Sequence, residues 1–95
     1  MAVVFHIPGY LRAFTAGAAR VELEASPTHV GEALVALWTT HPGVRDRVVT
    51  ERGEVRPHIN IFVGDENIRF AQGLMTPVPP GAEISIVPAV SGGRT

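Results

Sequence analysis

The residues with the clearest chemical potential lie at the end of the chain, in Ser91-Gly92-Gly93 followed by Arg94-Thr95. Glycine has no Cβ and a wide choice of backbone dihedrals, so a Gly-Gly segment can pass through a narrow channel. Inside a partner's active site, a free carboxylate on Gly93 could attack the α-phosphate of a nucleotide. Because the Gly93 carbonyl forms an amide with Arg94, that activation requires the removal of Arg94 and Thr95. The alternative is that the glycine pair belongs to a frayed terminus.

Side-chain chemistry offers much less than this tail. The chain has no cysteine, which excludes disulfides, thiolate zinc sites and a cysteine nucleophile. Neither a phosphate-binding glycine loop nor a serine nucleophile elbow occurs. The four histidines have no metal-ligand spacing from another His, Asp or Glu: His6, His29, His41 and His58. We therefore expect no enzyme and no metal or cofactor bound by this chain, but a protein co-substrate that reacts through its backbone.

Length and composition indicate one small domain. The chain has 95 residues, of which 45% are hydrophobic, enough for a single core. A net charge of −1 and a pI of about 6.4 disfavour general nucleic-acid binding. The stretch from Met1 to Pro8 lacks a basic region and is too short for a membrane span or a signal peptide. We expect a cytoplasmic protein with no nucleic-acid or membrane partner.

The first half of the chain predicts two strands and a helix. The β-branched run from Val3 to Ile7 predicts a strand, and the alternation over 20–25 predicts its antiparallel neighbour. Ser26 or Thr28 is expected to cap a helix that ends near Thr40, before a His-Pro-Gly sequence. Apolar residues form one helical stripe at Val30, Ala33, Leu34, Leu37 and Trp38.

The second half predicts mainly strands. Loops are expected over Tyr10–Gly17 and 50–57, and a short helical turn over 44–49. Strands are predicted over 58–63 and 83–87, with a short edge strand over 67–70. A right-handed crossover places the last strand beside the first, parallel and central. This order predicts an α+β fold of the β-grasp (ubiquitin-like) type, with a mixed four- to five-stranded sheet and one main helix. The expected domain covers residues 1–90, and residues 91–95 form the tail.

Alternation also predicts an apolar patch on the sheet face that the helix does not cover. Phe62 and Val87 lie on adjacent predicted strands and point away from the helix. Two such residues near the tail could form a docking site for a partner. Single exposed apolar residues are common, so the alternative is that neither has a partner.

Taken together, the fold order and the tail resemble the MoaD/ThiS family of ubiquitin-like sulfur carrier proteins. The resemblance covers the chain as far as Gly93 and is carried by four stretches: Thr28 to Leu34, Asn60 to Val63, Ile68 to Leu74 and Glu83 to Gly93. Within the family, the chain looks most similar to CysO-type carriers of cysteine synthesis.

The resemblance implies a reaction sequence. An E1-like enzyme of the MoeB/ThiF type would use ATP and Mg to adenylate Gly93, with Ser91 and Gly92 threading its channel. A sulfur donor would then form a thiocarboxylate for a sulfur-accepting synthase. A zinc-dependent JAMM-type peptidase would first remove Arg94 and Thr95. Two alternatives stay open: a ubiquitin-like modifier that joins Gly93 to lysines, and a MoaD-like small subunit of molybdopterin synthase. The receiving pathway is not specified by the sequence.

Overall fold

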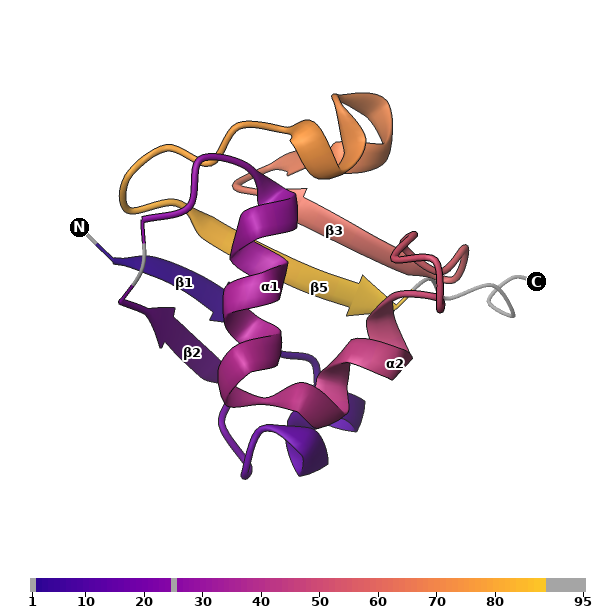
Figure 1. The fold of residues 1–95 in the computed structure, drawn as a ribbon. Coiled ribbons are helices and arrows are strands. Elements are labelled where there is room, and N and C mark those ends of the chain that lie inside the picture. Colours follow the sequence, from indigo (N-terminus) through magenta and orange to yellow (C-terminus); the bar gives the residue numbers. More distant parts are fainter. Residues whose placement is uncertain (1, 25, 89–95) are drawn as a thin grey trace.

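The protein folds as one mixed sheet with a helix across one face (Figure 1). The computed structural model describes residues 2–24 and 26–88. The strands are β1 (Val3–His6), β2 (Arg20–Leu23), β3 (Ile59–Val63), β4 (Glu66–Asn67) and β5 (Glu83–Pro88). The α-helices are α1 (Val30–Thr40) and α2 (Arg45–Val48), and short 3₁₀ helices cover Gly9–Phe14, Pro42–Val44, Ile68–Phe70 and Gly73–Met75.

The strand order β2-β1-β5-β3-β4 places the last strand at the centre of the sheet. Strand β5 pairs parallel with β1, where Phe5 lies opposite Ile84, and antiparallel with β3, where Ile61 lies opposite Ile86. Parallel neighbours require a crossover, and α1 lies on the connection that leads away from the β1–β2 hairpin. The predicted β-grasp fold and the central, parallel last strand are therefore confirmed.

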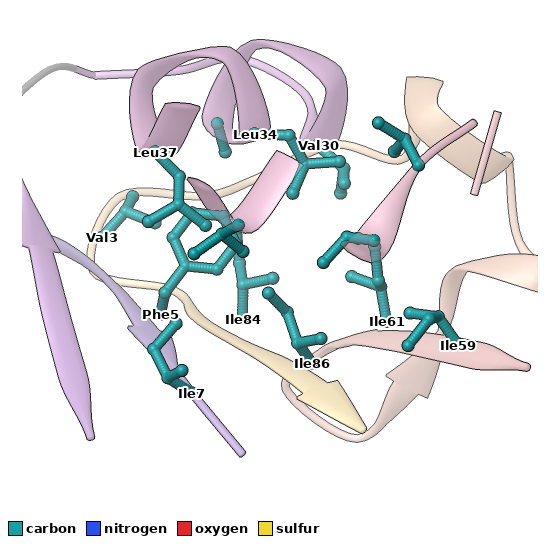
Figure 2. Close-up of a cluster of buried hydrophobic side chains, with 14 of the residues drawn as sticks. Val3, Phe5, Ile7, Val30, Leu34, Leu37, Ile59, Ile61, Ile84 and Ile86 are labelled. Carbon is teal, nitrogen blue, oxygen red and sulfur yellow. The ribbon is translucent and has the colours of Figure 1, made fainter. Parts of the chain in front are cut away.

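The core lies between α1 and one face of the sheet (Figure 2). Alternate strand residues such as Phe5, Ile61 and Ile84 point toward Leu34 and Leu37 of the helix, and all are at most 2% exposed. Full burial of each such side chain contributes about 1.5–3 kcal/mol. The central strand β5 is consequently held by hydrogen bonds on both edges and by packing on one face.

Helix α1 begins differently from the prediction. Its N-cap is His29, not Ser26 or Thr28. The His29 backbone is extended, and its Nδ1 accepts a hydrogen bond from the Glu32 N–H at 3.3 Å. The Glu32 carboxylate in turn accepts from the N–H and the hydroxyl of Thr28, at 2.7 and 2.8 Å. A histidine ring nitrogen here takes the role that cap preferences assign to Ser, Thr, Asp or Asn.

The edge strand predicted over 67–70 was wrong in extent. Strand β4 is only Glu66–Asn67, and Ile68–Phe70 turns as a 3₁₀ helix. The turn forms because the Asn67 side-chain oxygen accepts the Arg69 N–H at 2.9 Å, a local bond that competes with strand pairing.

Two segments outside the sheet and the main helix form short helices. The loop expected over Tyr10–Gly17 contains the 3₁₀ helix Gly9–Phe14, which buries Leu11 in the core. The helical turn expected over 44–49 is confirmed by α2. Both segments add side chains to the core: Leu11 from the first, and Val44, Val48 and Val49 from the second.

Candidate functional site at the end of strand β5

The candidate site is the segment that follows β5. The last described residue is Pro88, which lies opposite Ile59 at the start of β3. The residues predicted to thread, react or be removed lie outside the described residues: Ser91, Gly92, Gly93, Arg94 and Thr95. Their roles stay predictions, and the structure describes the base from which this segment leaves.

That base is firmly held. In β5, Ile84 and Ile86 are buried in the core, and the strand is paired along both edges. A strand with these contacts opens only when a large part of the domain unfolds. The position of Pro88 is therefore fixed relative to the sheet, as a presenting strand requires.

Arg69 strengthens the neighbouring strand end, a contact that pattern reasoning missed. Its Nη2 donates to the carbonyl oxygens of Pro57 and Ile59, at 3.2 and 3.1 Å. Ile59 begins β3 opposite Pro88, and Pro57 lies two residues before it. An arginine at this position carries no sequence signal for the role, because the contact depends on the turn that follows β4.

The predicted docking residues lie on the sheet face opposite α1. Phe62 is half-buried and lies opposite Ser85, while Val87 is 39% exposed and lies opposite Asn60. This register makes Phe62 and Val87 diagonal neighbours, about 7–8 Å apart in such pairs and within reach of an aromatic ring. Val87 thus adjoins Pro88, whereas Phe62 lies opposite Ser85, three residues before it. The docking role of both residues stays a prediction.

The remainder of this outer face contains the buried Val4 and several polar side chains. His6 Nε2 and Glu83 Oε1 are 2.6 Å apart, and both side chains are largely exposed. Ser85 lies opposite His6 in the register, but no hydrogen bond joins the two among the described residues. The three side chains therefore do not form a nucleophile activated by a base, although their residue types match one.

Within residues 2–24 and 26–88, no three His, Cys, Asp or Glu side chains are grouped so that they could hold a metal ion. Of the histidines, His29 caps α1 and His6 pairs with Glu83. No helix in the same range has the length and apolar character needed to cross a membrane.

A five-stranded mixed sheet with a central C-terminal strand and one crossing helix defines the ubiquitin-like β-grasp class of small proteins. Within that class the chain belongs to the ThiS family, whose family model matches residues 5–93. The predicted membership of the MoaD/ThiS family is thereby confirmed.

Individual relatives agree with this assignment. The sulfur carrier protein CysO of Mycobacterium tuberculosis is 35% identical over 95 residues, covering 98% of this chain and 100% of that protein. A chain in the crystal structure of the Amycolatopsis orientalis BexX/CysO complex has a TM-score of 0.86 and 38% identity, covering 97% of this chain and 100% of that one. Small archaeal modifier protein 1 of Haloferax volcanii is 38% identical over 74 residues, covering 78% of this chain and 79% of that protein. These relatives are named as carriers or modifiers, not as catalytic enzymes.

Proposed function

We propose that this chain is a sulfur carrier whose Gly93 becomes a thiocarboxylate after Arg94 and Thr95 have been removed. The observation that carries the proposal is that the ThiS match ends at Gly93, the second residue of the glycine pair. The near-full-length likeness to CysO and the fixed end of β5 add support. The sulfur would pass to a synthase that makes cysteine or another sulfur-containing metabolite.

The proposed chemistry has three steps. A JAMM-type metallopeptidase hydrolyses the Gly93–Arg94 amide and leaves a free carboxylate on Gly93. An E1-like adenylyltransferase of the MoeB/ThiF type then binds Mg-ATP, and a carboxylate oxygen attacks the α-phosphorus and releases pyrophosphate. Hydrosulfide released by a sulfur donor then attacks the acyl carbon, expels AMP and leaves the thiocarboxylate. We assign these steps to the cytoplasm, where ATP is available.

In this proposal the carrier's own contribution is presentation. The activating enzyme would contact Phe62 and Val87 while the tail enters its active site, because Val87 precedes Pro88 and Phe62 is its diagonal neighbour on the same face of the sheet. Apolar contacts beside the reacting segment orient it, and orientation is a large part of the advantage of an enzyme-bound substrate.

The test is ATP–pyrophosphate exchange by the activating enzyme with three versions of the chain. One is full length, one ends at Gly93, and one ends at Gly92. We expect exchange only with the version that ends at Gly93. Equal exchange with the version that ends at Gly92 would contradict the assignment of the reactive carboxylate, and equal exchange at full length would contradict the need for trimming.

A second function, protein modification, is favoured by the likeness to small archaeal modifier protein 1. In that reading the activated Gly93 is joined to lysines of other proteins. The chain contains no lysine; its eight basic residues other than histidine are all arginine. Conjugates should therefore contain no lysine-linked chains of this protein. Because Arg69 is the nearest tryptic site before Gly93, a remnant of residues 70–93 on target lysines, found by mass spectrometry of a tryptic digest, would favour this function over sulfur transfer.

A further inference from the structure

Among residues 2–24 and 26–88, no strand pairs with the outer edge of β2. Strand β2 lies at one end of the sheet, and Figure 1 draws no strand beyond it. The Ile7 N–H donates to the Ala19 carbonyl at 2.8 Å, so Ala19 directs its polar groups toward β1. Because antiparallel pairs alternate, Val21 also faces β1, whereas the N–H and C=O groups of Arg20 and Glu22 face the open edge.

The side chains along this edge are self-complementary. Arg20 and Glu22 are exposed and lie on the outer face of the sheet, while the intervening Val21 packs against the core. A second copy that pairs antiparallel about Val21 would place each Arg20 opposite Glu22 of the other copy. The residues that face each other would then be those whose backbone groups are free.

Other registers of the same pairing are less favourable. A slip centred on Arg20 or on Glu22 puts like charges directly opposite each other, which is destabilising. A register centred on Arg20 also needs Ala18, whose carbonyl already accepts the Thr15 hydroxyl at 2.8 Å and whose N–H donates to the Thr15 carbonyl. Charge on an edge strand usually discourages pairing, but within β2 the opposite signs of Arg20 and Glu22 favour one register, since Glu24 lies beyond the end of the strand.

We propose that β2 of one copy pairs with β2 of a second copy, centred on Val21, to form a two-fold dimer with one continuous sheet. Each Arg20–Glu22 pair would exchange both backbone hydrogen bonds and place opposite charges side by side. A strand of four residues buries little surface, so the dimer is expected to be weak and to form at high concentration.

This arrangement leaves the candidate site free. Strand β5 is separated from the β2 edge by β1, and the two-fold axis reverses its direction in the second copy. The two Pro88 ends would therefore point in opposite directions, with Phe62 and Val87 uncovered on the same side of the joined sheet. The dimer would carry two tails that are available to separate partners, and its existence does not depend on the sulfur-carrier proposal.

Sedimentation equilibrium over a concentration series into the millimolar range tests the dimer. The single reversals Arg20→Glu and Glu22→Arg should each weaken dimerisation about tenfold, because two opposite-charge pairs become like-charge pairs. The double variant with both reversals should restore it. Glu51→Arg, an equal charge change in an exposed loop, should leave it unchanged. A protein that stays monomeric throughout, or a double variant no better than either single one, would overturn the proposal.

Amide hydrogen exchange locates the contact. As concentration rises, the amides of Arg20 and Glu22 should gain protection, while the Val21 amide, which faces β1, should not. A dimer with protected amides elsewhere in the chain would overturn the assignment to β2. Circular dichroism of each variant at low concentration checks that the monomer is still folded.

Discussion

The two faces of the sheet differ in what they contact. One face is apolar and lies beneath α1, where Phe5, Ile61 and Ile84 are almost completely buried. The other face carries the His6–Glu83 pair, the buried Val4 and the apolar side chains of Phe62 and Val87. On the docking proposal, the first face determines stability and the second determines binding to partners. Substitutions on the two faces should therefore affect different measurements.

The largest effect on stability is expected at Ile84. Ile84→Ala should lower the free energy of unfolding by about 2–5 kcal/mol, because it leaves a cavity beneath α1 in the central strand. The matched control is Val87→Ala on the outer face of the same strand, where surface substitutions usually change stability by about 0.5 kcal/mol or less. Denaturant titration of both variants gives the comparison. Equal losses would contradict a division of the two faces between folding and recognition.

The same comparison predicts the reverse result for binding. Phe62→Asp with Val87→Asp should weaken binding to the activating enzyme by about tenfold or more, because aromatic and apolar anchors dominate interfaces. Isothermal titration calorimetry with the version ending at Gly93 measures the change. Asp65→Asn, in the exposed turn after β3, serves as a control that should bind normally. Unchanged binding by the double variant would remove these two residues from the docking surface.

The start of α1 gives an intermediate effect on the core face. His29→Ala removes the Nδ1 acceptor of the Glu32 N–H and should cost about 1 kcal/mol of unfolding free energy. His29→Asn supplies another good cap and should retain most of the stability. Thermal unfolding of the two variants separates the stabilisation due to the capping hydrogen bond from that due to packing of the imidazole ring. Similar losses in both would mean that the imidazole acts through packing.

The smallest effect concerns the pH dependence at the same helix start. The Thr28 N–H, and then the Thr28 hydroxyl, lower the pKa of Glu32 below its unfolded value. The resulting stabilisation should be fully present above about pH 4.3, the usual pKa of an unfolded Glu, and be lost as the pH falls through the lower folded value. Glu32→Gln should thus be less stable than the parent protein at neutral pH and converge with it in acid. Denaturant titrations between neutral and acidic pH would record this, and a gap that persists in acid would contradict the assignment.

The spacing of apolar residues was sufficient to predict the order of the main strands and the helix. Alternation in Glu83 to Val87 and the helical stripe from Val30 to Trp38 report burial directly, so the fold order followed from them. Local hydrogen bonds decided the errors. His29 caps a helix, and Asn67 ends a strand, through side-chain geometry that residue preferences do not encode.

The candidate site also has one part that could be predicted from the sequence and another that could not. The glycine pair could be identified from the sequence because its chemistry belongs to the backbone and needs no partner within the chain. The contact of Arg69 with the end of β3 and the edge groups of β2 depend on how distant segments align. No periodicity reports such alignment, so these features required the structure.

The most direct test of the sulfur-carrier proposal is the intact mass of the protein purified from its native cells. We expect a species that ends at Gly93 in which one oxygen of the terminal carboxylate is replaced by sulfur, and treatment with an alkylating reagent should modify that sulfur alone. The proposal would be contradicted if, in cells that must synthesise their own cysteine and other sulfur-containing metabolites, all of the protein retained Arg94 and Thr95 and carried no added sulfur.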